Sequence, residues 1–440
     1  MISAFAHKKV LVYGYGVSGK AAAKLLDEKG ARVFVYDDKK TETEFPFCLN
    51  PEESADTFDL FVVSPSVGTD NYIVKKAQEA KVPVIGELEL AYAFCDSEIV
   101  AVTGTNGKTT VCKMIKELIA ASGRAAYMLG NSGVAFSEKA AELLDGEVAV
   151  VETSSFQLSR TDSFEPEIAV VLNVKPDHLD YHKTFGEYVQ AKSRILQNQT
   201  KKDHAVFNFD DRVAASMASK SFAKNYYFSK KTRVHGCFVE NNVIYFEDEQ
   251  KIGIMETERL SVFGDHNLEN ALAAITVACI MGINPKIIEK VMSDFRLPDF
   301  RMQFVGRKGG KNYFNDSKGT NVSATLAALS AVSGDTLLIL GGSDKGECFD
   351  ELFEKMPGSV KRILVTGANG DKIIEAALRA GRFDVSYRAT LKECVTESLS
   401  FSGENVVFSP SSASFDKFSD YVDRGNTFNK YFSELPDAQN

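Results

Sequence analysis

Residues 102–110 decide the fold of this chain and read Val102-Thr103-Gly104-Thr105-Asn106-Gly107-Lys108-Thr109-Thr110. An apolar run over residues 99–103 leads into this stretch, and an amphipathic stretch over residues 111–121 follows it. A glycine-rich loop between a strand and a helix holds phosphate, because its backbone N–H groups surround the oxygens, its lysine reaches the β- and γ-phosphates and its threonine binds Mg²⁺. Val102 replaces the first glycine of the strict motif, but the context still predicts an ATP site. The expected contacts are Gly104, Thr105, Asn106, Gly107, Lys108, Thr109 and Thr110.

The same alternation of apolar run, turn and amphipathic stretch continues along most of the chain. Consecutive apolar residues, rather than alternating ones, are typical of strands that are buried on both faces of a parallel sheet. The repeat therefore predicts an α/β fold. Between residues 225 and 260 the short strands lie close together, which indicates antiparallel hairpins on one sheet edge. The expected strands include residues 9–13, 99–103, 147–151, 168–174, 336–340, 363–366 and 405–408.

A second glycine-rich loop, Gly14-Tyr15-Gly16-Val17-Ser18-Gly19, follows the strand over residues 9–13. Asp37 closes the next strand, which completes a dinucleotide-binding layout. We expect a nucleotide or phosphate here, and the alternative is a turn that only packs a helix on a strand. A third loop, residues 365–371, carries Asp371 where a phosphate loop has lysine, so we interpret it as a structural turn.

The length of 440 residues predicts two to four domains. We place a short Rossmann-like domain at residues 1–95, a P-loop ATPase-like domain with a mostly parallel sheet at 96–297, and a second Rossmann-like domain at 298–440. The first boundary follows the helix-like residues 87–96, and the second lies at Leu297-Pro298.

Composition excludes several classes of protein. The net charge of −9 argues against nucleic acid or an anionic membrane as a partner. Seven cysteines without a CxxC motif indicate neither a disulfide framework nor a zinc knuckle. The longest apolar stretch, residues 271–283, is too short to span a bilayer, and the first nine residues do not resemble a signal peptide. We therefore expect a cytoplasmic protein without membrane insertion, and as a separate expectation we take it to be a monomer.

Two polar residues follow buried strands of the central domain. Glu152 follows residues 147–151, at the edge where parallel sheets bind ligands, and is a candidate Mg²⁺ ligand or a helix cap. His178 follows residues 168–174 and lies at the same predicted edge, although a lone loop histidine is more often a surface residue.

Lys192 is the most informative single residue. Thr184 and Glu187 form a capping-box pattern at the start of a predicted helix. On that helix Lys192 falls inside the apolar stripe, where burial lowers the pKa of a lysine. A neutral buried amine can react with CO₂ to give a metal-binding carbamate, and the alternative is a lysine whose head reaches water. The stripe consists of Tyr188, Val189, Lys192, Ile195 and Leu196.

Taken together, these motifs resemble the Mur ligase family, the ATP-dependent amide ligases of peptidoglycan precursor synthesis. The resemblance runs in order along nearly the whole chain, and residues 315–321 resemble the branch that adds D-glutamate. The landmarks are residues 104–109, the segments around Glu152 and Asp177-His178, and residues 264–271, 315–321, 409–416 and 424–426.

The resemblance implies that ATP phosphorylates the alanyl carboxylate of UDP-N-acetylmuramoyl-L-alanine and that the amine of D-glutamate attacks the acyl phosphate. Such a ligase serves cell wall biogenesis, and through it cell shape, the cell cycle and cell division. The implied catalytic residues are Lys108, Glu152, His178 and Lys192. Two Mg²⁺ sites are implied, with ligands from Thr109, Glu152, His178 and carbamylated Lys192.

Binding residues are implied in the same way. Further ATP contacts are Asn267, Asn270, Arg301 and Asp316. The UDP-substrate contacts are Gly16, Val17, Ser18, Asp37, Asp38, Asn131, Ser154 and Gln157. The D-glutamate contacts are Lys318, Thr320, Lys345, Ser414 and Tyr421. The chain departs from the family at Phe300, where many relatives have histidine, and at Asp344, where the acid beside Lys345 is shifted.

Three alternatives remain open. Another Mur enzyme or a folate-polyglutamate ligase does not fit Asp316-Ser317-Lys318. A nicotinamide dehydrogenase built on residues 14–19 leaves Lys108 and Lys192 unexplained. A regulatory ATP-binding protein without catalysis is disfavoured by the complete catalytic set, but residues alone do not exclude it.

Overall fold

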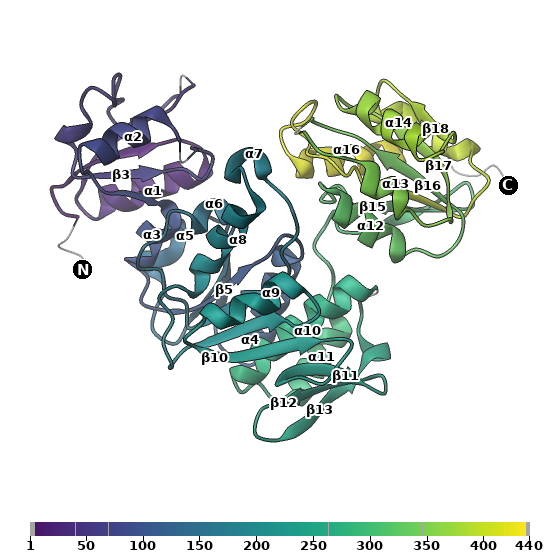
Figure 1. Ribbon diagram of the computed structural model, residues 1–440, viewed down its shortest axis with the longest axis horizontal. Coiled ribbons are helices and arrows are strands. Elements are labelled where there is room, and N and C mark those ends of the chain that lie inside the picture. Colours follow the sequence, from purple (N-terminus) through teal and green to yellow (C-terminus); the bar gives the residue numbers. More distant parts are fainter. Residues whose placement is uncertain (1–4, 40, 69, 263, 345, 437–440) are drawn as a thin grey trace. The chain divides into compact units, whose positions relative to one another are not determined.

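The computed structural model describes residues 5–39, 41–68, 70–262, 264–344 and 346–436, and they form the predicted α/β fold (Figure 1). The chain divides into two compact units. The first contains Met1–Ser261 and Leu268–Phe295, and the second contains Val262–Asn267 and Arg296–Asn440. The predicted boundaries after residues 95 and 297 stay predictions.

The first unit opens with a four-stranded parallel sheet in the order β2-β1-β3-β4. Successive residues of β1 face opposite layers, as expected for a strand buried on both sides. Val10 and Val12 pack on one side with residues of α1 and α3, while Leu11 and Tyr13 pack on the other with α2. The elements are β1 (Lys9–Tyr13), α1 (Val17–Glu28), β2 (Arg32–Tyr36), η2 (Ala55–Thr57), β3 (Leu60–Val63), α2 (Tyr72–Glu79), β4 (Val84–Gly86) and α3 (Glu87–Tyr92).

A nine-stranded sheet follows in the order β13-β12-β11-β10-β9-β8-β5-β7-β6. It is parallel from β6 to β11, and only the β11–β12–β13 edge is antiparallel, which confirms the hairpins expected there. The strands are β5 (Glu98–Thr103), β6 (Ala126–Gly130), β7 (Val148–Glu152), β8 (Ile168–Val171), β9 (His204–Asn208), β10 (Lys224–Ser229), β11 (Gly236–Glu240), β12 (Val243–Glu247) and β13 (Lys251–Glu256).

Helices cover this sheet. Helices α3, α5, α6, α8 and α9 contribute apolar residues to one core, while α4 packs on β6 and β7 with α11 beside it. The elements are α4 (Lys108–Ala121), α5 (Phe136–Lys139), η3 (Ala140–Glu142), α6 (Ser155–Leu158), α7 (Leu179–His182), α8 (Phe185–Ser193), η4 (Arg194–Leu196), α9 (Arg212–Met217), η5 (Ala218–Lys220), η6 (Thr257–Arg259), α10 (Asp265–Ile280) and α11 (Pro285–Asp294).

The second unit is built on a six-stranded sheet in the order β14-β15-β19-β16-β17-β18, in which only β14 is antiparallel. Two apolar layers sandwich it, one with α15 and α16 and the other with α12, α13 and α14. The elements are β14 (Gln303–Lys308), β15 (Lys311–Asn315), α12 (Val322–Ser330), β16 (Thr336–Leu340), α13 (Asp350–Glu354), β17 (Val360–Val365), α14 (Gly370–Arg379), β18 (Val385–Tyr387), α15 (Leu391–Glu397), η7 (Ser398–Ser400), β19 (Asn405–Phe408) and α16 (Tyr421–Ser433).

Two further findings concern the sequence predictions. Strand β8 ends at Val171 rather than at residue 174, because Asn173 leaves the sheet and bonds the glycine loop after β5. Among the residues that the structure describes, no helix is long and apolar enough to cross a membrane.

Helix α3 joins the first sheet to the second, and its two buried glutamates attach it there. Glu87 accepts a 2.6 Å hydrogen bond from the backbone N–H of Ser137. Glu89 accepts hydrogen bonds from three consecutive backbone N–H groups, those of Asp162, Ser163 and Phe164. The Glu89 carboxylate therefore supplies the hydrogen-bond acceptor for three successive backbone N–H groups before β8.

We predict that Glu89→Ala destabilises the first unit by about 3 kcal/mol, because it leaves several buried N–H groups without an acceptor. Urea unfolding followed by circular dichroism measures the loss. Glu79→Ala is the matched control, since Glu79 pairs only with Lys76 on the surface. Equal stability of the two variants would contradict this role for Glu89.

Candidate active site

The loop between β5 and α4 has the geometry of a phosphate loop. Gly104 and Gly107 have φ angles of +158° and +90°, a region that favours glycine. A Cβ on Gly107 would come within 2.3 Å of Oδ1 of Asn270, so Asn270 lies against the loop. The side chain of Asn173 accepts from the backbone N of Asn106 (2.9 Å) and donates to its carbonyl (3.0 Å). The loop is thus held rigidly before any ligand enters.

Two buried oxygen atoms at this loop fit a magnesium ion. Oγ1 of Thr109 and Oε2 of Glu152 are buried without a hydrogen-bond partner. Buried polar atoms normally have partners, and hydroxyl and carboxylate oxygens are ligands that Mg²⁺ takes. The other oxygen of Glu152 accepts a 3.0 Å hydrogen bond from Nδ2 of Asn131. No group of three or more His, Cys, Asp or Glu side chains that could hold a metal exists among the described residues.

Lys192 is buried, with only 1% of its surface exposed, so the alternative in which its head reaches water is wrong for this structure. Its Nζ donates a 2.8 Å hydrogen bond to the carbonyl of Gly104, the same oxygen to which Nζ of Lys108 donates at 2.9 Å. Burial and the charge of Lys108 hold the pKa of Lys192 well below its usual value. The amine is therefore shielded from water, and its lowered pKa favours the neutral form that carbamylation needs.

His178 is the N-cap of α7, a single helical turn flanked by two residues with positive φ angles. The φ angles of His178 and Lys183 are +55° and +60°. The His178 ring lies 4.8 Å from the ring of Phe156, and its backbone N donates to Oδ1 of Asp177 at 2.9 Å. Because α7 is so short, the contacts of its own side chains set the position of His178.

The first glycine loop also has the predicted strand–loop–helix form. A Cβ on Gly19 would come within 1.9 Å of the Gly14 carbonyl, so the helix approaches the turn closely. Helix α1 begins at Val17 without a side-chain cap. Oδ2 of Asp37 accepts from the backbone N of Tyr15 at 2.7 Å, and Asp38 accepts from the Tyr13 hydroxyl at 2.9 Å. The two acids thus hold the loop as well as standing beside it.

Three other predicted UDP-substrate residues make internal contacts. Asn131 bonds Glu152, as described above. Ser154 and Gln157 form a capping box at the start of α6, in which each side chain bonds the backbone N of the other. Their positions at the carboxyl ends of β6 and β7 agree with the predicted edge of the sheet, and their binding role stays a prediction.

The predicted residues of the second unit gather around the carboxyl ends of β15 and β19. Asp316 is buried, and its carboxylate accepts from Oγ of Ser409 (2.7 Å) and the backbone N of Met302 (3.2 Å). Loss of water raises the pKa of Asp316 to about 7, although Ser409 and Arg301 act in the opposite direction. Nζ of Lys318 lies 3.6 Å from the centre of the Tyr421 ring.

Arg424 holds this group together, and sequence reasoning did not assign it a role. Its guanidinium is buried and donates to the carbonyls of Ala413 (2.9 Å) and Ser317 (2.8 Å). Those residues adjoin Ser414 and Lys318. The signal for such a role is weak, since a buried arginine cannot be told from an exposed one on a polar helix. Of the other predicted residues, Thr320 lies in the same loop, and Lys345 lies outside the described residues.

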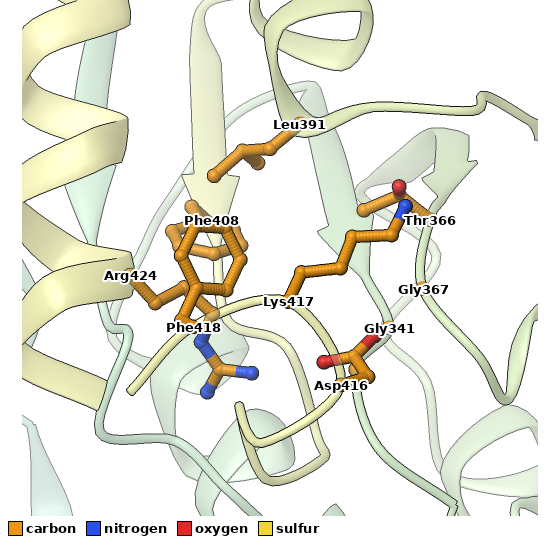
Figure 2. Close-up of a pocket in the computed structure, with 10 residues that line it drawn as sticks. Gly341, Thr366, Gly367, Leu391, Phe408, Asp416, Lys417, Phe418 and Arg424 are labelled. Carbon is orange, nitrogen blue, oxygen red and sulfur yellow. The ribbon is translucent and has the colours of Figure 1, made fainter. Parts of the chain in front are cut away.

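The third glycine loop is packed as a structural turn. A Cβ on Gly367 would come within 2.6 Å of the backbone N of Gly342, and Asn369 accepts from that same N–H at 3.0 Å. A small pocket lies beside it, lined by residues that include Thr366, Asp416 and Arg424 (Figure 2). Backbone of Gly342 therefore occupies the space in front of this loop in which a phosphate loop would bind phosphate.

The raised pKa of Asp316 makes a prediction about stability. A folded-state pKa of about 7 against a usual 3.8 means that the folded protein holds a proton that the unfolded chain releases. As the pH rises from 4 to 7, the free energy of unfolding of the wild type should therefore fall, relative to that of Asp316→Asn, by up to about 1.4 kcal/mol per pH unit. Urea unfolding of both proteins across this range measures the difference. A difference independent of pH would show that Asp316 is not protonated in the fold.

Comparisons with known proteins agree with this geometry. The family model for the Mur ligase middle domain matches residues 102–278, and the model for the Mur ligase, glutamate ligase domain matches residues 300–411. The UDP-N-acetylmuramoylalanine–D-glutamate ligase of Thermoanaerobacter pseudethanolicus is 38% identical, with 97% of this chain and 98% of the relative covered. That of Streptococcus gordonii is also 38% identical, with 99% of each covered.

Solved structures show the same fold. The UDP-N-acetylmuramate–alanine ligase MurC of Thermotoga maritima has a TM-score of 0.62 at 19% identity, covering 97% of this chain and 100% of that one. MurF of Acinetobacter baumannii has a TM-score of 0.63 at 14% identity, covering 98% of this chain and 92% of that one. With its domain matches and its relatives along nearly the full length, the chain belongs to the Mur ligase family.

Proposed function

We propose that this chain is an ATP-dependent ligase that joins D-glutamate to UDP-N-acetylmuramoyl-L-alanine in peptidoglycan precursor synthesis. Relatives named for this reaction match it at 34–38% identity over nearly the whole length. The observation in the structure that carries the proposal is the buried amine of Lys192 beside Lys108, under a phosphate loop. A bound nucleotide alone needs no such second lysine.

The reaction starts from a carboxylate, which is a poor electrophile until phosphate gives it a leaving group. Transfer of the γ-phosphoryl group of ATP makes an acyl phosphate, the amine of D-glutamate attacks its carbonyl carbon, and phosphate leaves. ADP, phosphate and the amide are the products. ADP is present in the solved structure of MurF of Thermotoga maritima, which has a TM-score of 0.60 at 15% identity.

Residues of the first unit hold the reacting phosphate. Lys108 releases the loop carbonyls that it bonds in this structure and turns to the β- and γ-phosphates. Mg²⁺, held by Thr109 and Glu152, would supply positive charge between the two anionic substrates. His178 and carbamylated Lys192 would hold a second ion. Asn131 keeps the Glu152 carboxylate aimed by bonding one of its oxygens.

The second unit binds D-glutamate, whose amine accepts the acyl group. Lys318, Thr320, Ser414 and Tyr421, with Lys345, form the D-glutamate pocket, and lysines suit a dicarboxylate. Asp316 and Arg301, with Asn267 and Asn270, contact the adenosine part of ATP. The first glycine loop binds the UDP part of the other substrate. We place the enzyme in the cytoplasm as a monomer, without nucleic acid or membrane as a partner.

An assay of phosphate release from ATP tests the function. We expect release only when UDP-N-acetylmuramoyl-L-alanine and D-glutamate are present together, since the acyl phosphate forms on one and is consumed by the other. Each substrate alone, L-glutamate in place of D-glutamate, and added EDTA are the controls. Release that does not depend on both substrates would sink the proposal.

Lys192→Ala should lower the rate by about 100-fold or more, because it removes a group that would hold charge-stabilising metal. Acetate or formate should restore part of the rate by replacing the carbamate. Carbon-13 NMR with labelled bicarbonate should show a carbamate signal in the wild type and none in the variant. Lys220→Ala, on an exposed turn, is the control. Full activity of Lys192→Ala would remove the carbamate from the mechanism.

A further inference from the structure

Three side chains from the part of the chain that forms the nine-stranded sheet bond to one loop of the four-stranded sheet. Nη2 of Arg160 donates to the carbonyls of Val67 (2.8 Å) and Gly68 (3.0 Å). The hydroxyl of Tyr181 donates to the Val67 carbonyl at 3.3 Å. Lys183 forms an ion pair with Asp70. We call Arg160, Tyr181 and Lys183 the clamp.

The gripped loop adjoins the first glycine loop. It follows β3, and β3 pairs with β1, so both loops leave the same edge of the sheet. A Cβ on Gly14 would come within 2.6 Å of the Cβ of Ser64, and the backbone N of Ser64 donates to the Tyr13 carbonyl at 2.8 Å. The first glycine loop is therefore packed directly against the start of the loop that follows β3.

The other end of the clamp is α7. Tyr181 lies on this single turn and Lys183 follows it, so two of the three clamp residues belong to the segment that His178 begins. The ring of Phe156 lies 4.8 Å from His178 and 4.5 Å from Tyr181, which connects the two through one packed side chain. Arg160 fixes the loop from the other side.

The burial of the Arg160 guanidinium carries a free-energy cost. Only 9% of its surface is exposed, and its Nε is buried without a partner. It also holds β4, since its carbonyl accepts from the backbone N of Gly86 at 3.1 Å. The hydrogen bonds of this guanidinium to the carbonyls of Val67 and Gly68 do not supply the attraction of an ion pair. This cost indicates that Arg160 serves to fix the position of the loop at residues 67–68.

We propose that Arg160 is a positioning residue that couples the UDP site to the reaction centre. Arg160 holds residues 67–68 against α7. When a nucleotide binds at the first glycine loop, this contact passes the ordering on to α7 and so to His178. The coupling rests on the proposed function, since it requires that a UDP group binds at the first loop. Its role is mechanical, and Arg160 touches no reacting atom.

Hydrogen exchange with UDP alone as the probe tests the coupling. In the wild type, UDP should slow amide exchange both at the first turn of α1 and in Leu179–His182. In Arg160→Met the slowing should remain at α1 and disappear from α7. The KM for UDP-N-acetylmuramoyl-L-alanine should rise about 10-fold while the KM for ATP stays unchanged, and Arg160→Lys should recover part of the effect.

Two controls separate coupling from simple stability. Arg124→Met removes an arginine that donates to the carbonyl of Gly146 and pairs with Glu98, at the ends of the strands opposite the glycine loops. Tyr181→Phe deletes one hydroxyl and leaves the packing, so it serves if Arg160→Met does not fold. Unchanged exchange of α7 in both clamp variants, or an equal KM rise for all substrates in Arg124→Met and Arg160→Met, overturns the coupling alone. A wild type that binds no UDP overturns the proposed function with it.

Discussion

Two lysines donate to one carbonyl, that of Gly104, and the rest of the proposed reaction centre depends on this shared acceptor. Burial of Lys192 removes the water that would stabilise its charged form, and the charge of Lys108 adds repulsion, so Lys192 gives up its proton more readily than a surface lysine. The backbone can offer that carbonyl because Gly104 adopts a φ angle of +158°. The loop therefore combines the form of a phosphate loop with a hydrogen bond to a buried amine. The unpartnered oxygens of Thr109 and Glu152 complete the polar surroundings.

Much of the fold could be predicted from the sequence, because a doubly buried strand requires consecutive apolar residues. The expected bounds of β1, β16 and β19 agree with the structure for this reason. The apolar stripe placed the stem of Lys192 against the core but left open whether its amine reaches water, and the structure shows the whole side chain buried. The role of Asn173 could not be predicted, since Asn173 reads as the continuation of an apolar strand and only tertiary contact shows it bonding Asn106. The burial of Asp316 has the same origin, because Ser409 and Met302 come from distant parts of the chain.

Phe300 illustrates how one departure from the family pattern is accommodated. Its φ angle of +61° is unusual for a bulky residue, and its ring lies where a Cβ on Gly425 would stand, 2.3 Å away. Its carbonyl accepts from the backbone N of Lys318 at 3.1 Å. The aromatic ring thus fills the space above the start of α16, and its backbone supports the loop of the expected D-glutamate pocket. Any side chain at position 425 would have to displace that ring.

The division of the chain into units has a consequence for synthesis on the ribosome. The first unit includes Leu268–Phe295, which follows a short segment that belongs to the second. Helix α11 from this late part packs on α4 and on β13. The phosphate-loop helix therefore keeps part of its apolar surface uncovered until nearly three hundred residues have left the ribosome. During that interval the nascent chain presents an unfinished core, the condition under which newly made proteins recruit chaperones.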